Sequence, residues 1–180
     1  MKNIISILIS ALILISCTPS KEELNTKIGN LETKFSQNIK QGFDITTANE
    51  LLETYASYIK NYSDDNQINE IKLKAGELAM NMKKHALAVN YLEQIYLQVS
   101  DFDKMEQVLF FLGNIYENQI FDIESAEKYY TELIEKYPNS KYANDVKITL
   151  NNLGKTAEEL FEELKLKNDS TQTDSLKENI

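Results

Sequence analysis

The sequence has no tryptophan and no arginine, and it contains only one cysteine, one histidine and two prolines. A single cysteine excludes an internal disulfide. The basic side chains are all lysine, and 19 of them against 28 acidic residues give a net charge of −9. This balance disfavours nucleic-acid binding, which depends on neutralising phosphates. The 180 residues, 42% of them hydrophobic, are enough for one domain with a substantial core.

The groups that catalysis requires are also scarce. The single histidine, His85, falls where we expect a turn between two helices, which favours a packed or half-exposed turn residue over a catalyst. There is no glycine-rich phosphate loop and no serine nucleophile elbow. Adjacent acids such as Asp64-Asp65 and Glu158-Glu159 lie on neighbouring rather than converging positions, which favours solvated faces over a cation site. We therefore predict no enzymatic activity, no cofactor and no metal site.

The N-terminus has the pattern of a processed export signal. Lys2 precedes a nearly pure apolar run over residues 4–15, which is too short to span a bilayer comfortably. The residues Leu14-Ile15-Ser16-Cys17 resemble the bacterial lipobox. This resemblance implies a signal peptide over residues 1–16 and a lipid-modified Cys17, with residues 17–19 as the acylated cysteine and a short tether. The alternative is a cysteine that merely ends an uncleaved apolar segment.

Two short features bear on where such a lipoprotein would reside. Thr18 follows the cysteine where an aspartate would resemble an inner-membrane retention signal, so we expect a lipid anchor in the outer membrane. The run Lys21-Glu22-Glu23 resembles a signal that sends some lipoproteins to the cell surface, but acidic residues also favour the first turn of a helix. We therefore favour the periplasmic face, with the cell surface as the alternative.

Apolar residues recur at spacings of three and four from residue 20 to residue 166, and no segment reads as a strand. This pattern predicts an all-α domain over residues 20–167, followed by a disordered tail over residues 168–180. Eight helices are expected, the sixth being stopped by Pro138 and the seventh starting at Asn139 or Ser140. Their predicted N-terminal capping residues are Ser20 with Glu23, Thr47 with Glu50, Asp103 with Glu106, Asp122, and Thr156 with Glu159.

The helices recur in pairs. Gly76 and Gly113 are 37 residues apart, whereas Ala88 and Ala126 are 38 apart, so one extra residue lies in the later turn. The pattern resembles the tetratricopeptide repeat consensus, which the third hairpin matches at Leu109, Leu112, Gly113, Tyr116, Ala126, Tyr130, Leu133 and Pro138. The resemblance implies antiparallel helical hairpins stacked as a short solenoid. Small residues at the helix crossings would let the backbones approach closely.

The resemblance also implies a partner-binding surface. The run K-Y-P-N-S-K-Y-A-N-D-V over residues 136–146 is similar to repeats of outer-membrane assembly lipoproteins and of the periplasmic Tol-Pal coordinator. In such repeats the first helix of each hairpin supplies the concave face, which here carries Glu70, Leu73, Glu77, Met80, Gln107, Phe110, Asn114 and Glu117. Relatives that grip a C-terminal carboxylate have lysine at the positions of Leu73 and Phe110. We therefore expect an acidic groove with an apolar floor that suits a basic or amphipathic partner.

These features predict a membrane-anchored, non-catalytic scaffold that binds an envelope protein or peptide, with a role in outer-membrane assembly or maintenance. The alternative is a surface-exposed lipoprotein that binds a ligand or glycan. Tyr55, Tyr58 and Tyr62 could line a groove for such a ligand, because aromatic rings give much contact area. In this repeat family, however, tyrosines mostly pack between helices, and we favour core packing for these three.

Overall fold

The computed structural model describes residues 18–38, 42–163 and 165–166. The predicted signal peptide, Cys17 and the predicted tail over residues 168–180 lie outside these residues. The helices are α1 (Lys21–Asn38), α2 (Ile45–Asn61), α3 (Ile68–Asn81), α4 (His85–Gln98), α5 (Met105–Ile115), the π-helix η2 (Tyr116–Ile120), α6 (Ile123–Lys136) and α7 (Ala143–Asn152). Residues 157–163 are also helical, and the described chain contains no strand. None of the described helices is long and apolar enough to cross a membrane.

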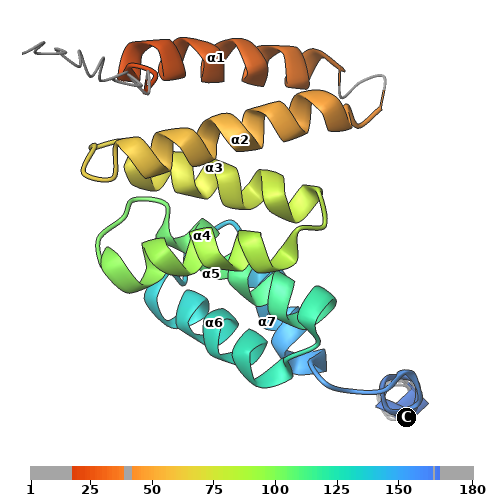
Figure 1. The fold of residues 1–180 in the computed structure, drawn as a ribbon. Helices are drawn as coiled ribbons and strands as arrows, with labels where there is room; N and C mark the ends of the chain where they lie inside the picture. Colours follow the sequence, from red (N-terminus) through yellow and green to blue (C-terminus); the bar gives the residue numbers. More distant parts are fainter. Residues whose placement is uncertain (1–17, 39–41, 164, 167–180) are drawn as a thin grey trace, which may run out of the picture.

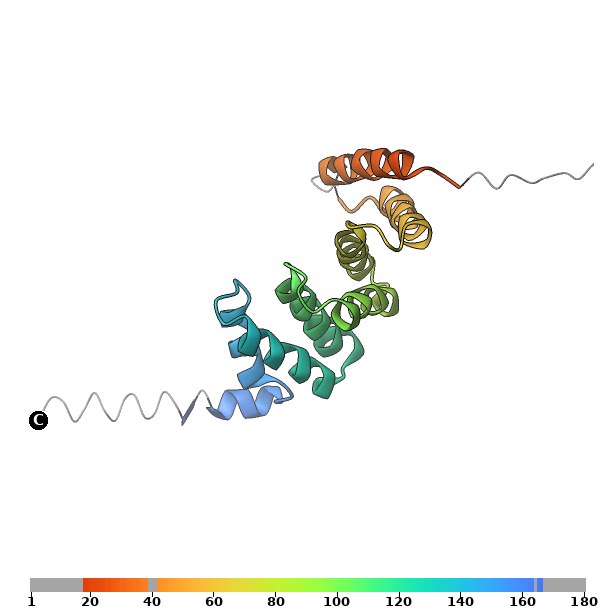
Figure 2. The same cartoon turned by 90° about the vertical axis from the view of Figure 1, so that its left-hand side faces the viewer.

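The helices stack in the order of the sequence. Each helix from α1 to α7 packs against the next, and α3 also contacts α5. Short turns make successive helices antiparallel, so α1 with α2, α3 with α4 and α5 with α6 form three hairpins (Figure 1). Figure 2 shows the chain advancing from α1 at one end to α6 and α7 at the other. The described chain is therefore an all-α solenoid of stacked helical hairpins that resembles tetratricopeptide repeats, as predicted.

The core runs along the whole stack, because each helix turns its apolar stripe toward its neighbours. The largest side chains that are almost completely buried include Tyr58, Leu92, Ile95, Leu109, Leu112, Ile115, Tyr130 and Leu133. Two helix crossings explain the glycines. A Cβ added at Gly113 would lie 2.4 Å from Cε1 of Tyr130, and one at Gly76 would lie 3.0 Å from Cδ2 of Leu92. Small residues at these crossings therefore allow the close approach that the repeat pattern predicted.

The extra residue of the third hairpin is accommodated at the end of α5. In the second hairpin, Lys83 has a left-handed conformation (φ 58°), and the Lys84 N–H donates to the carbonyl oxygen of Ala79 at 2.8 Å. Phe121, 38 residues after Lys83, has the same conformation (φ 61°), but the next N–H, of Asp122, donates one residue further back, to Tyr116 at 2.9 Å. The inserted residue thus widens the last turn into the π-helix η2. Gly113 accordingly meets Tyr130 across α5 and α6, as Gly76 meets Leu92 across α3 and α4.

Some helix starts differ from those predicted. The capping box of Ser20 with Glu23 is confirmed, because the Ser20 N–H donates to the Glu23 carboxylate at 2.7 Å and the Glu23 N–H donates to the Ser20 hydroxyl at 3.2 Å. The capping box of Thr156 with Glu159 is confirmed by equivalent bonds of the same lengths. Thr47 is not the N-cap of α2, because that helix begins at Ile45 and is capped by Asp44, which accepts from the Thr47 N–H at 3.0 Å.

The predicted starts of two later helices are also wrong. Helix α5 begins at Met105 with Lys104 as its N-cap, so Asp103 does not cap it, and Lys104 makes no side-chain capping bond. Helix α7 begins at Ala143 rather than at residue 139 or 140. Ser140 lies in the preceding turn, where its hydroxyl accepts from the Tyr142 N–H at 3.2 Å. In contrast, Asp122 caps α6 as predicted, accepting from the Ser125 N–H at 3.1 Å.

Candidate functional site

Helix α3 carries four of the residues predicted to form the concave surface. Glu77 is exposed, and Glu70 and Met80 are half-buried, so these three side chains reach the surface. Leu73 is only 2% exposed and belongs to the hydrophobic core. Its assignment to a contact surface is therefore wrong, because its side chain packs inside the stack and offers almost no area to a partner.

Helix α5 and η2 carry the other four residues, Gln107, Phe110, Asn114 and Glu117, all of them half-buried. The ring of Phe110 stacks on Tyr142, the N-cap of α7, with centroids 4.3 Å apart and planes 12° from parallel. This contact joins α5 to α7 along one side of the solenoid. Lys141 places its Nζ 4.8 Å from the centroid of the Tyr142 ring. An apolar and aromatic surface with one cation therefore lies at this end of the predicted groove.

Ion pairs hold neighbouring helices together across the same face. Lys104 Nζ lies 2.6 Å from Glu70 Oε2, which ties the start of α5 to α3. Lys74 Nζ lies 3.0 Å from Glu32 Oε1, which ties α3 to α1. Within the described residues, Glu77 makes no such pair. Lys74 and Lys104 are thus engaged by Glu32 and Glu70, whereas Glu77 and Glu117 have no cation paired with them within the described residues.

Tyrosine hydroxyls donate to carboxylates between helices. Tyr130 donates to Glu117 at 2.8 Å, and both Tyr116 and Tyr129 donate to Glu93, at 2.9 and 3.1 Å. Burial, together with the nearby Glu93 carboxylate, raises the pKa of Tyr116 to about 12. Glu117 is therefore partly engaged in holding η2 to α6. Sequence patterns do not reveal these bonds, because the partners lie on different helices.

The tyrosines of the first hairpin also serve packing. Tyr55 is 2% exposed and Tyr58 is fully buried, which confirms the expectation that they lie in the core. Tyr55 donates to Glu32 at 2.6 Å, and both burial and this carboxylate raise the pKa of Tyr55. Tyr62 donates to the carbonyl oxygen of Pro19 at 2.9 Å. Tyr55 and Tyr62 therefore fasten α1 and the preceding residues to α2.

A hollow of about 220 Å³ lies where α1, α2 and α3 meet, and we call it the α1–α3 hollow. It is lined by Glu32, Phe35, Leu51, Tyr55, Lys74, Glu77, Leu78 and Asn81. Of these residues, Glu77 was predicted to lie on the partner-binding surface, and Tyr55 was considered for a ligand groove but expected in the core. The others were missed because the first hairpin matches the repeat consensus only in its second helix, so nothing in the sequence aligned α1 with α3.

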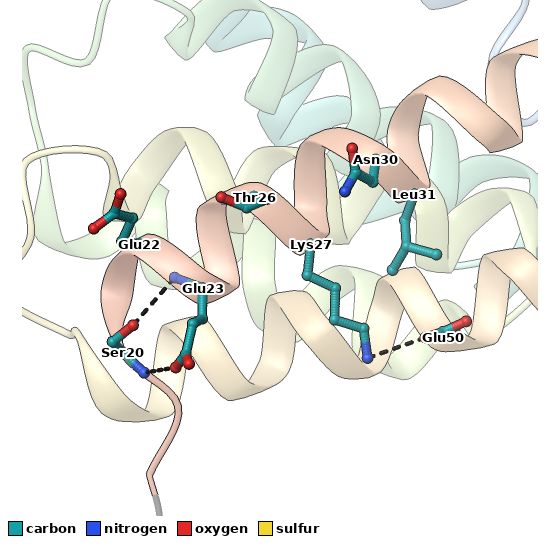
Figure 3. A pocket seen from close by; sticks show the side chains of 8 residues that line it. All are labelled: Ser20, Glu22, Glu23, Thr26, Lys27, Asn30, Leu31 and Glu50. Carbon is teal, nitrogen blue, oxygen red and sulfur yellow. Dashed lines mark hydrogen bonds and ion pairs between the residues drawn. The ribbon is translucent and has the colours of Figure 1, made fainter.

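A larger hollow, of about 670 Å³, lies along α1 and is shown in Figure 3. Seven of its eight lining residues are polar or charged, and two pairs of them bond to each other. Lys27 reaches Glu50 of α2 at 3.0 Å, and Ser20 and Glu23 form the capping box of α1. Leu31, its one apolar residue, is 7% exposed. Specific binding sites are usually lined mainly by apolar side chains, and this hollow has only one.

The described residues include no group of three or more His, Cys, Asp or Glu side chains that could hold a metal ion. His85 is the first residue of α4 and is half-buried. Its Nδ1 is buried and has no hydrogen-bond partner within the described chain. No acid, base or nucleophile therefore converges with it in the part of the protein that the structure describes.

Comparison with protein families places this geometry in a class. Residues 107–140 match the family described as tetratricopeptide repeat, and they cover most of α5, all of η2 and α6, and the start of the turn to α7. The match supports the interpretation that the chain is a tetratricopeptide repeat protein. Such repeats are typically non-catalytic modules that bind other proteins, so a protein partner is supported in general. Comparison with curated proteins finds no match.

Proposed function

We propose that this protein is a membrane-anchored scaffold of the bacterial cell envelope that binds another envelope protein or peptide and uses no catalysis. The observation that carries the proposal is the face shared by α3 and α5, where the exposed Glu77 and the stacked Phe110 accompany a matched tetratricopeptide repeat. An acidic surface with aromatic contacts suits a basic or amphipathic partner. A role in outer-membrane assembly or maintenance is the pathway that we favour.

Capture of partners tests the scaffold. The full-length protein is crosslinked in intact cells, purified, and compared with a variant carrying Phe110→Ala and Glu77→Lys. Glu77 is exposed, whereas Phe110 is half-buried and stacked on Tyr142, so circular dichroism is used to verify that the variant keeps its fold. We expect the variant to lose at least one specific partner. Recovery of the same partners at equal yield would show that α3 and α5 do not form the contact surface.

The membrane anchor rests on the lipobox-like residues Leu14 to Cys17. Removal of the signal and acylation of Cys17 would give a firmly held protein, since each acyl chain contributes about 0.8 kcal/mol per buried methylene. Replacing Cys17 with Ala is expected to move the protein from the membrane fraction to the soluble fraction after cell lysis. If the variant stays membrane-bound after a carbonate wash, acylation is not the anchor.

A separate test concerns whether the protein faces the periplasm or the cell surface. Within the described chain, Lys21 pairs with Asp65, and Glu23 accepts from the Ser20 N–H at 2.7 Å. Lys21 thus ties the start of α1 to the turn between α2 and α3, and Glu23 caps α1; these structural roles support the periplasmic face over surface export. Protease treatment of intact cells is expected to leave the protein uncut until the outer membrane is permeabilised. Digestion in intact cells would instead favour a surface-exposed ligand- or glycan-binding lipoprotein.

A further inference from the structure

The α1–α3 hollow has an apolar interior and a charged rim. Phe35, Leu51 and Leu78 supply the apolar lining, one from each of the three helices. Phe35 is half-buried, and its ring meets that of Phe43 edge-on, with centroids 5.4 Å apart. This aromatic contact holds the Phe35 ring at the wall of the hollow. Glu77 and Asn81, which are exposed, stand on the rim contributed by α3.

The volume of the hollow indicates the size of its occupant. Sites for complete small-molecule ligands are typically about 300–1,000 Å³. At about 220 Å³, the α1–α3 hollow is smaller than this range but large enough for one bulky apolar side chain. Pockets of this kind receive the anchor residues that dominate protein–protein affinity. The dimensions therefore favour a side chain of a partner protein over a free ligand or glycan.

The charges around the hollow indicate what lies beside that side chain. Glu32 already accepts from the Tyr55 hydroxyl at 2.6 Å and pairs with Lys74 at 3.0 Å. Lys74 is thereby neutralised at the rim. Glu77 lies one turn further along α3 and has no cation paired with it among the described residues. The rim thus keeps one negative charge that a partner could complement.

We propose that the α1–α3 hollow receives one large apolar side chain of a partner protein, and that a neighbouring lysine or arginine of the same segment pairs with Glu77. This assignment rests on the proposed scaffold function and makes it more specific. It places the anchoring contact between the first and second hairpins, whereas the matched repeat lies in the third. The partner segment is consequently amphipathic and basic.

Site-specific photo-crosslinking tests the assignment in the full-length protein. A benzoylphenylalanine placed at Asn81 reports on the hollow, and the same group at Phe110 reports on the aromatic surface of α5. Glu53 is the control position, because it is exposed on α2 but lines a different hollow, with residues such as Leu24 and Ser57. Cells are irradiated, and the crosslinked peptides are sequenced by mass spectrometry. We expect Asn81 to crosslink a protein segment in which Leu, Ile, Met or Phe adjoins Lys or Arg, and Glu53 to crosslink none.

A synthetic peptide of the crosslinked segment then measures the two contacts. We expect Glu77→Lys to weaken its binding at least tenfold, Glu53→Lys to leave it unchanged, and Asn81→Trp, which fills the rim, to weaken it at least tenfold. Changing the peptide cation to glutamate is expected to restore binding to the Glu77→Lys protein. Equal affinity of the wild-type and Glu77→Lys proteins would overturn the charge pairing, and equal affinity of Asn81→Trp would overturn occupancy of the hollow.

The crosslinks also separate this inference from the scaffold proposal. Crosslinks to protein from Phe110 but not from Asn81 would retain the scaffold and refute the α1–α3 hollow as its anchor site. Crosslinks from Asn81 only to lipid or glycan would refute the protein occupant. Absence of protein crosslinks at both positions would count against the scaffold itself.

Discussion

At the scale of single residues, Gly113 shows how a repeat pattern becomes a packing requirement. The Tyr130 ring is 2% exposed and lies so close that a Cβ at position 113 would approach two of its carbon atoms to within 2.4 and 2.5 Å. Because the ring is buried and bonded to Glu117 through its hydroxyl at 2.8 Å, it cannot easily move aside. The glycine is therefore required for space and not for backbone freedom.

This contact predicts opposite effects for the same substitution at two glycines. Gly113→Ala is expected to destabilise the protein by roughly 1–3 kcal/mol through overpacking. Gly29→Ala, within α1, has nothing within 4 Å of its added Cβ and is expected to stabilise by roughly 0.5–1 kcal/mol through helix propensity. Urea denaturation of both variants measures these changes. A neutral Gly113→Ala would show that α5 and α6 can separate without cost.

Asp44 predicts a pH dependence of stability. Hydrogen bonds from the Thr47 hydroxyl and N–H, and from Asn38, lower the pKa of Asp44 to about 2. Since the unfolded value is about 3.9, the stabilisation is fully present above that pH and is lost as the pH falls toward 2. An asparagine in its place would still cap α2 but would not titrate. We therefore expect the stability advantage of the wild type over Asp44→Asn to shrink between pH 5 and pH 2, measured by urea denaturation at each pH.

At the scale of elements, helix periodicity was enough to predict the order of the helices and the pairing of α1 to α6 into three hairpins. The spacing of glycines and alanines also revealed the extra residue between α5 and α6. Its accommodation as a π-helix was not predictable, because the sequence does not say which turn will widen. Similarly, the bonds of Tyr116 and Tyr129 to Glu93 depend on side chains brought together from α4, η2 and α6.

The groove was predicted less well than the fold for a related reason. Counting along α3 placed Leu73 on the concave face, yet its side chain is 2% exposed. Periodicity gives the direction of a side chain around its own helix, but burial depends on how neighbouring helices cross. Phe35 and Lys74 were not predicted as part of a site, because their contacts form between α1 and α3, and these helices are not adjacent in the sequence.

The turn after η2 predicts a stabilising substitution. Phe121 is 77% exposed and has a left-handed backbone conformation (φ 61°), which is costly for a residue with a Cβ. Phe121→Gly is expected to raise the free energy of unfolding by roughly 0.5–1 kcal/mol, since the relief of strain outweighs the greater entropy of the unfolded chain. Gln119→Gly, two residues earlier in η2, is the control and is expected to destabilise by about 1 kcal/mol. Thermal and urea unfolding distinguish the two.

At the scale of the whole molecule, a solenoid distributes its stability through contacts between neighbouring elements. Helix α1 packs mainly on α2, whereas α5 packs on both α4 and α6. A substitution that destabilises a terminal helix can therefore let that helix unfold locally. A substitution in an interior helix also destabilises the helices on both sides of it. The α1–α3 hollow lies between the first and second hairpins, so opening of α1 would also open the hollow.

Hydrogen exchange tests this difference. Leu24→Ala and Leu112→Ala each remove a buried side chain, 4% and 0% exposed, and each is expected to cost roughly 2–5 kcal/mol. We expect Leu24→Ala to accelerate amide exchange in α1 and α2 only, and Leu112→Ala to accelerate it from α4 to α6. Uniform acceleration by Leu24→Ala would show that the chain unfolds as a single cooperative unit.

The bond from the Tyr62 hydroxyl to the carbonyl oxygen of Pro19 has a consequence for how the protein would sit on a membrane. With the proposed acylation, only Thr18 separates the lipid-bearing Cys17 from Pro19. The Cα atoms of Cys17 and Pro19 are therefore at most about 7 Å apart. Lipid and solenoid would then diffuse and tilt as one body. The groove would stay at a constant distance from the bilayer. A partner would then be selected by how far its binding segment projects from the membrane as well as by its charge.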